Sequence, residues 1–252
     1  MLLFRRIFDF QKQDVQQFVD QRLNRRYTPG RLFPLRAALV NGARETPAKI
    51  HDLSASGIAL VTDRAAAPAP GKDATVRLTL PPHVLELHGH AAHFRPLGDD
   101  EMLCGLSLVF EDFTRLKSYL QLLQPVAIGG TLQAVDPARV QQNEPRFIKQ
   151  VFRGESDSVL SIWLAKTPGT PLHSFEFRMR DYFVRADAAV GVLEVFLREQ
   201  NEATHKGKMT TPVFDTTGAA SEEIRQLFRW VVPNLPPEVP EDVRVFMLRM
   251  AG

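Results

Sequence analysis

Apolar and polar residues alternate over six short stretches in the first half of the chain, as they do in strands that bury one face. Turn signals such as Asn41-Gly42, Pro81-Pro82 and Gly98-Asp99-Asp100 separate these stretches, and no helical repeat interrupts them. The six predicted strands cover residues 32–40, 47–53, 58–62, 75–80, 84–94 and 102–110. Short antiparallel strands at this spacing predict a small barrel or sandwich.

Two helical patterns flank the predicted strands. Apolar residues recur at helical spacing over residues 11–24, which predicts an amphipathic N-terminal helix. A second apolar stripe over residues 113–123 predicts a helix that Pro125 ends. The composition then changes over residues 126–130, which indicates a domain junction.

The second half of the chain mixes both patterns and predicts an α+β domain. Helix start signals at Asp136-Pro137 and at Ser221-Glu222-Glu223 predict two helices, of which the first reaches Asn143. Residues 242–250 fit either a short helix or a strand. Four further strands are predicted over residues 147–152, 159–166, 173–180 and 192–198.

We therefore expect a mainly β chain with an α+β part, arranged in three regions. These are an N-terminal amphipathic helical extension (residues 1–20), a six-stranded antiparallel barrel with flanking helices (21–125), and a C-terminal α+β domain without a visible role (126–252). With 252 residues, 44% apolar and 24% charged, the chain has the composition of a globular protein. It has no apolar run of transmembrane length and no signal-peptide pattern, so we expect a cytoplasmic protein.

Few residues suggest catalysis or metal binding. No nucleophile elbow, phosphate-binding loop or zinc-protease motif is present, so we expect no enzyme. The single cysteine, Cys104, excludes an intramolecular disulfide. His88 and His90 share a strand face near His83 and His93, but this alternation fits an exposed barrel face better than a set of metal ligands. We therefore expect neither a metal nor a cofactor.

The charged residues are unevenly distributed, since residues 1–36 hold eight Lys and Arg against three Asp, a local net charge of +5. Five of these arginines, at positions 22, 25, 26, 31 and 36, precede the turn Asp52-Leu-Ser54-Ala-Ser-Gly57. Arginine binds phosphate with two parallel hydrogen bonds. A carboxylate and a hydroxyl accept hydrogen bonds from the N–H edge of a base, and glycine lets a ligand approach the backbone. Together these residues suit a small ligand that carries both phosphate and purine.

The order of basic arm, strand, hairpin, strand and Asp-x-Ser-x-x-Gly turn resembles the PilZ domain, a bacterial receptor module for cyclic di-GMP. The resemblance covers about residues 21–123, and the turn matches in full. The closing strand and helix of the family resemble residues 105–110 and 113–123.

The arginine arm of the family, Arg-x-x-x-Arg, fits this chain in two ways. Arg22 and Arg26 have the family's spacing but lie far from Asp52. Arg26 and Arg31 lie nearer with one inserted residue, and we favour this pair, with Arg22 or Arg25 assisting.

The resemblance implies a cyclic di-GMP receptor that changes conformation on binding and signals to an unidentified protein partner in motility, polysaccharide or virulence control. The arginines would bind the phosphodiesters and guanine, Asp52 and Ser54 would bind a guanine, and Gly57 would admit the ligand. The implied ligand-binding residues are Arg22, Arg25, Arg26, Arg31, Asp52, Ser54 and Gly57. The alternative is a PilZ-like interaction module that does not bind nucleotide. Non-specific nucleic-acid binding through residues 1–36 is disfavoured because no aromatic stacking platform is evident, and we expect no specific nucleic-acid partner. The sequence leaves open whether the chain forms a homodimer.

Overall fold

The computed structural model describes residues 2–8, 25–169, 171–198, 213–215 and 218–252. Contacts within the chain divide it into two compact units, Met1–Val126 and Ala127–Gly252. Among the described residues, none of the helices is both long enough and apolar enough to cross a membrane.

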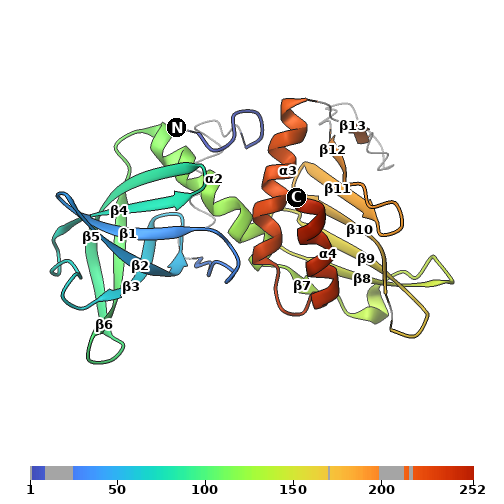
Figure 1. Cartoon of the computed structure of the whole chain (residues 1–252), viewed down its shortest axis with the longest axis horizontal. Coiled ribbons are helices and arrows are strands. Elements are labelled where there is room, and N and C mark those ends of the chain that lie inside the picture. The colour runs from blue at the N-terminus through green and yellow to red at the C-terminus, as the bar shows by residue number, and fades with distance from the viewer. Residues whose placement is uncertain (1, 9–24, 170, 199–212, 216–217) are drawn as a thin grey trace. The chain divides into compact units, whose positions relative to one another are not determined.

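The first unit is built on a closed antiparallel barrel of six strands (Figure 1). Around the barrel the strands follow the order β1-β2-β3-β6-β5-β4, so each strand pairs with two neighbours. Their bounds are β1 Arg36–Asn41, β2 Arg44–Leu53, β3 Gly57–Asp63, β4 Asp73–Leu80, β5 His83–Pro96 and β6 Glu101–Val109. The predicted mainly β fold with a six-stranded barrel is confirmed.

The alternation along these strands fills the interior of the barrel with apolar side chains. Leu60, Val76, Leu78, Leu87 and Cys104 are 0% exposed. Burial raises the pKa of Cys104 to about 11, so its thiol stays protonated at neutral pH. Cys104 is therefore a core residue.

The helix after the barrel, α2 (Phe113–Gly130), is longer than predicted because Pro125 does not end it. Proline lacks the N–H that would bond to the carbonyl of Gln121, which ordinarily costs about 3 kcal/mol in a helix. Leu122 and Leu123 before the proline and Val126 and Ala127 after it are almost fully buried. Burial of apolar side chains on both sides offsets this cost, so the helix continues through residues 126–130, where the chain also divides into its two units.

The described N-terminal residues 2–8 form bends, and the helix predicted over residues 11–24 lies outside the described residues. One buried side chain, Gln121 of α2, holds this segment. Its Oε1 accepts hydrogen bonds from the backbone N–H groups of Leu3 (3.0 Å) and Phe4 (3.1 Å). Its Nε2 donates to the carbonyls of Phe4 (2.8 Å) and Phe8 (3.2 Å). Phe4, Ile7 and Phe8 are buried, so the segment belongs to the core of the first unit.

The second unit is a seven-stranded antiparallel sheet with helices packed against one face (Figure 1). The order of its strands is β13-β12-β11-β10-β9-β8-β7. Phe175 of the sheet stacks on Phe228 of α3 with 5.7 Å between ring centroids and meets Phe246 of α4 edge-on at 6.1 Å. The bounds are β7 Gln133–Ala134, β8 Phe147–Arg153, β9 Val159–Ala165, β10 Leu172–Met179, β11 Tyr182–Asp187, β12 Glu194–Arg198, β13 Val213–Asp215, α3 Ala219–Val231 and α4 Glu241–Ala251.

Three local predictions in this unit were wrong. Asp136 does accept a hydrogen bond from the N–H of Ala138 (3.0 Å), but it starts only a 3-10 turn, η1 (Pro137–Arg139), and no helix reaches Asn143. Helix α3 begins after Gly218 at φ 85°, so Ser221 and Glu222 lie inside the helix instead of capping it. Strand β11 was missed, because the turn before it, Arg180-Asp181, contains neither glycine nor proline.

Helix α2 packs closely against the end of α3 at Gly129. A Cβ on Gly129 of α2 would lie 2.6 Å from the carbonyl oxygen of Val231 and 2.8 Å from the Cβ of Asn234. Gly129→Ala is therefore expected to destabilise the second unit by about 1–3 kcal/mol, as overpacking does. The fluorescence of Trp230, which is 2% exposed on α3, reports this unfolding in urea.

Gly130→Ala is the matched control, because its Cβ would meet only the carbonyl oxygen of Asn234, at 3.8 Å. Alanine also favours a helix over glycine, so this variant should be at least as stable as the wild type. Equal unfolding midpoints for the two variants would contradict the contact.

Candidate functional site

The predicted Asp-x-Ser-x-x-Gly turn connects β2 to β3 and holds two almost buried polar side chains. Asp52 and Ser54 are each 8% exposed. The N–H of Ser54 donates to the carbonyl of Gly57 (2.8 Å), which closes the turn. A Cβ on Gly57 would lie 2.9 Å from the carbonyl oxygen of Leu106 on β6. Glycine is therefore required here by the neighbouring strand.

The arginine arm reaches the turn through its backbone. Tyr27 and Leu53 exchange two hydrogen bonds, of 2.8 Å and 2.9 Å, and so add a short antiparallel bridge at the end of β2. This bridge places the preceding residue, Arg26, beside the turn, where its guanidinium donates to Oδ1 of Asp52 at 2.8 Å. The side chain of Arg26 is 61% exposed and that of Asp52 is 11% exposed. The pair thus presents one accessible cation next to a recessed carboxylate.

His51 is a member of the site that the sequence analysis missed. Its Nδ1 lies 2.9 Å from Oδ2 of Asp52, so each carboxylate oxygen has one partner. Neighbouring residues of a regular strand point to opposite faces, and the pattern gave no reason to place His51 with Asp52. The register shift between Ile50 and Asp52 marks an irregularity of β2 that allows this contact.

Tyr119 of α2 contacts the backbone of the turn through its hydroxyl. The sequence predicted this residue only as part of an apolar stripe. Its hydroxyl donates to the carbonyl of Ser54 (2.8 Å) and lies 3.1 Å from that of Gly57. Burial, together with the negative charge of Asp52, raises the pKa of Tyr119 far above its usual range. The hydroxyl therefore stays protonated, as a donor must. A tyrosine on a buried helix face is a signal for such a partner.

The structure thus gathers four of the seven predicted residues at one place: Arg26, Asp52, Ser54 and Gly57. Arg25 precedes Arg26 and is exposed. Arg31 is exposed in the turn after Gly30 and forms no ion pair with Asp52 in the described part of the arm. Arg22 lies outside the described residues.

The histidines of β5 do not form a metal site. Nδ1 of His88 contacts the hydroxyl of Thr75 (3.0 Å), and Nδ1 of His90 contacts Oδ1 of Asp73 (2.7 Å). Within the described ranges no group of three or more His, Cys, Asp and Glu side chains could hold a metal ion.

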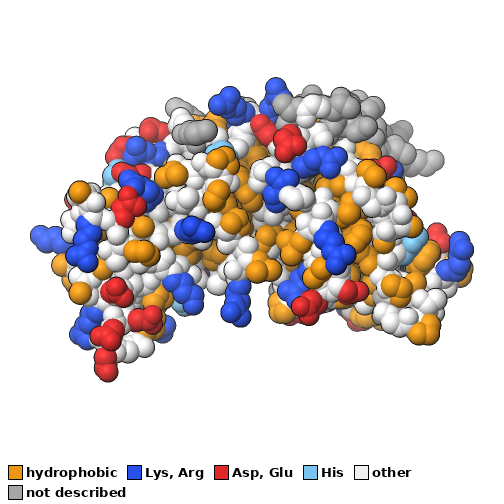
Figure 2. Space-filling model, viewed as in Figure 1, with side chains coloured by type: hydrophobic (Ala, Val, Ile, Leu, Met, Phe, Trp, Pro, Cys, Tyr) orange, Lys and Arg blue, Asp and Glu red, His pale blue; other side chains and the backbone are white. Residues whose placement is uncertain are grey.

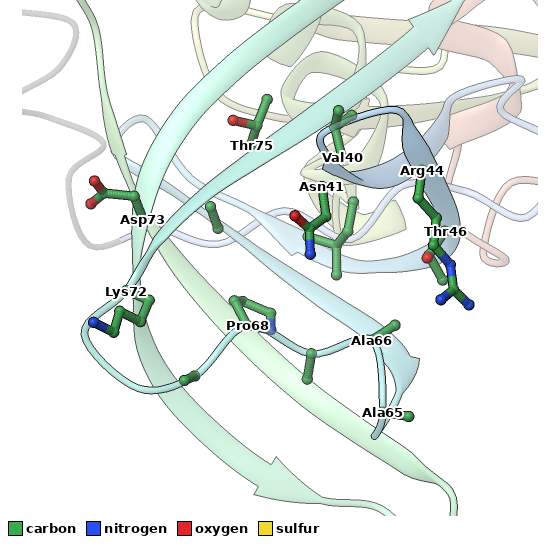
Figure 3. A pocket seen from close by; sticks show the side chains of 14 residues that line it. Val40, Asn41, Arg44, Thr46, Ala65, Ala66, Pro68, Lys72, Asp73 and Thr75 are labelled. Atoms are coloured by element: carbon green, nitrogen blue, oxygen red, sulfur yellow. The ribbon is translucent and has the colours of Figure 1, made fainter.

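A separate pocket of about 360 Å³ lies between the β1–β2 hairpin and the loop before β4 (Figure 3). It is lined by Asn41 and Arg44 of the hairpin, by the alanine-rich loop around Pro68, and by Lys72 and Asp73. Thr46, which also lines it, precedes Asp52 by six residues of the same strand, or about 20 Å. The pocket is therefore distinct from the Asp52 turn.

Basic and acidic side chains are interspersed over the face of the molecule seen in Figure 2. Nucleic-acid-binding proteins instead gather Lys and Arg into a patch or stripe.

Of three comparisons with known proteins, a family model bears on the barrel and its arm. No curated protein matches the chain. Among solved structures, the Borreliella burgdorferi PlzA protein in complex with c-di-GMP is 7% identical, with 75% of this chain and 87% of that chain covered and a TM-score of 0.34, a likeness too weak to support an argument. The family model of the PilZ domain matches residues 20–123, which include the arm, the six strands and the first part of α2. Residues 20–123 of this chain are a PilZ domain.

Proposed function

We propose that this PilZ domain binds cyclic di-GMP at the β2–β3 turn and that the chain is a cytoplasmic receptor without catalytic activity. The observation that carries the proposal is the pairing of an exposed Arg26 with a recessed Asp52 beside the backbone of Ser54 and Gly57. These groups offer a phosphate-binding cation and a base-binding carboxylate within one hydrogen bond of each other.

The chemistry of cyclic di-GMP fits both groups. A guanidinium has five N–H donors, and Arg26 uses one of them on Asp52, so others are available to a phosphodiester. A carboxylate oxygen accepts more than one hydrogen bond, so Asp52 can also accept from the N1–H and N2–H edge of guanine. We propose that Arg25 and Arg31 add positive charge to the site and that Arg22 assists them.

The proposed receptor signals through α2. The Tyr119 hydroxyl contacts the turn, and ten residues later Gly129 of the same helix packs within the second unit. A ligand that moves the turn would therefore act on α2. We propose that a protein partner reads this change, and the pathways implied by the family are motility, polysaccharide export and virulence control.

Calorimetric titration of the full chain tests the first step. We expect cyclic di-GMP to bind with a dissociation constant in the micromolar range or below, and cyclic di-AMP to bind at least about 100-fold more weakly. Adenine lacks the N1–H donor, and a site built to accept from such donors rejects an analogue without them. Equal affinity for the two dinucleotides, or no binding of either to the folded chain, would contradict the proposal.

The competing function is a PilZ-fold interaction module that binds no nucleotide. One observation favours it: Arg26 and His51 already satisfy both carboxylate oxygens of Asp52 without a ligand. This function predicts that the same proteins co-purify with the chain with and without cyclic di-GMP, and that Arg26→Ala leaves that set unchanged.

A further inference from the structure

His51 is the extra residue of a β-bulge at the candidate site. Ile50 pairs with Leu60 and Asp52 pairs with Ala59, so three residues of β2 span two of β3. A bulge re-aims side chains that would otherwise alternate between the faces of a sheet. Here it leaves the His51 ring against the carboxylate of Asp52, with 2.9 Å between Nδ1 and Oδ2.

The Asp52 carboxylate therefore has two partners, the guanidinium of Arg26 and the imidazole of His51. Arg26 holds Oδ1 at 2.8 Å, and His51 holds Oδ2. An ionised carboxylate can only accept, so Nδ1 of His51 carries a hydrogen, while Nε2 is an acceptor in the neutral ring and a donor in the protonated one. The His51 side chain is 47% exposed, which leaves it accessible beside the turn.

We propose that His51 is a positioning residue of the dinucleotide site: it holds Asp52 in place while Arg26 binds the phosphates, and its protonation tightens binding. The inference rests on the proposed function. With a neutral ring, the charges of Arg26 and Asp52 cancel. With a protonated ring, the three side chains together carry one positive charge, and His51 alone can hold the carboxylate while Arg26 binds the ligand.

The charged side chains nearest to His51 on β2 and β1, apart from Asp52, belong to a lysine and an arginine. Lys49 lies two residues earlier on β2, and Arg36 begins β1 beside Ala37, whose partner is Ala48. Lysine and arginine titrate above pH 10. The paired stretch of β3, residues 59–61, has no charged side chain. Arg25 belongs to the arm. Histidine is the side-chain type whose charge ordinarily changes near neutral pH, and His51 is the histidine that contacts Asp52.

The direction of the pH effect follows from linkage. A ligand with two negative charges favours the protonated ring, so binding takes up a proton. The extra affinity is therefore present in full at acidic pH and is lost as the pH rises through neutrality.

Titration calorimetry of the full chain with cyclic di-GMP from pH 5.5 to 8.5 tests the inference. We expect the wild type to bind roughly 5–10-fold more tightly at the acidic end, within the range of ordinary coupling energies. His51→Gln should abolish most of this dependence. Titrations in buffers of different ionisation enthalpy should show proton uptake in the wild type and none in His51→Gln, a result that loss of structure alone does not produce.

His90→Gln is the matched control. Nδ1 of His90 lies 2.7 Å from Oδ1 of Asp73, so it is also a histidine paired with a carboxylate. It lies on β5, which is three strands from β2 in either direction around the barrel. This variant should keep the wild-type pH profile.

His51→Arg supplies a permanent charge, and we expect it to bind at pH 8.5 about as tightly as the wild type does at pH 5.5, without pH dependence. If the pH dependence of binding persisted in His51→Gln, or if His51→Arg bound as weakly as His51→Gln, the role of His51 would be overturned, while the proposed function would stand. Absence of binding to the folded wild type at every pH would overturn the proposed function together with it.

Discussion

Replacing Arg26 by alanine is expected to weaken cyclic di-GMP binding by about 100-fold or more. A hydrogen bond to a charged group contributes about 1.5–3 kcal/mol, and a bidentate phosphate contact makes two of them. Loss of both exceeds the 2.7 kcal/mol that corresponds to about 100-fold in affinity. The variant should remain folded, because the Arg26–Asp52 pair is largely exposed on the arginine side and such pairs contribute little to stability.

Arg36→Ala is the control for this experiment. Arg36 belongs to the same arginine run and is exposed at the start of β1, but no ion pair joins it to the Asp52 carboxylate in the described structure. It should lose only the few-fold affinity that comes from general positive charge. Calorimetry gives both affinities, and thermal unfolding shows whether each variant is folded. Similar losses for Arg26→Ala and Arg36→Ala would mean that the arm attracts the ligand without a specific contact.

Truncating Tyr119 to alanine is expected to destabilise the barrel unit by about 3–5 kcal/mol, the usual cost of removing a large core side chain. The side chain is 0% exposed, and its ring lies 5.5 Å from that of Phe110. Tyr119→Phe keeps the ring and removes only the hydroxyl. Because this leaves the buried carbonyl of Ser54 without its donor, we expect a loss of about 1–3 kcal/mol.

The two Tyr119 variants should differ in their effect on the turn. Both tryptophans, Trp163 and Trp230, lie in the second unit, so hydrogen exchange of peptides from β2 and β3 is the better measurement. Tyr119→Phe should speed exchange at residues 54–57 more than elsewhere in the barrel. Tyr182→Phe, on β11 of the second unit, is the control and should leave these peptides unchanged. Uniform changes over the whole barrel in Tyr119→Phe would contradict a specific role of the hydroxyl.

The sequence predicted the barrel well because each of its strands buries one face. Along β4, for example, every second residue (Val76, Leu78 and Leu80) is buried in the core, and this alternation is easy to recognise in the sequence. The same logic failed at Pro125, where burial of the residues around it overrides the local tendency of proline to end a helix.

The candidate site was predicted in part, for a related reason. Asp52, Ser54 and Gly57 were recognisable because their spacing is local, within one turn. His51 could not be placed, since a bulge is set by pairing with β3 and not by the composition of β2. The role of Tyr119 depends on a contact 65 residues away along the chain. The arm was ambiguous in register, and the bridge between Tyr27 and Leu53 is what places Arg26 at the carboxylate.

The attachment of the N-terminal segment through Gln121 has a consequence for how the first unit opens. Four backbone hydrogen bonds of residues 3–8 depend on one amide, and none of them is part of the barrel ladders. The segment can therefore detach as its own cooperative unit while the six strands stay closed. Such an opening would expose the buried side chains of Phe4 and Ile7 to solvent, and the free-energy cost of this exposure opposes the opening. Residues 3–8 are thus held on α2 by the Gln121 amide together with burial of their apolar side chains.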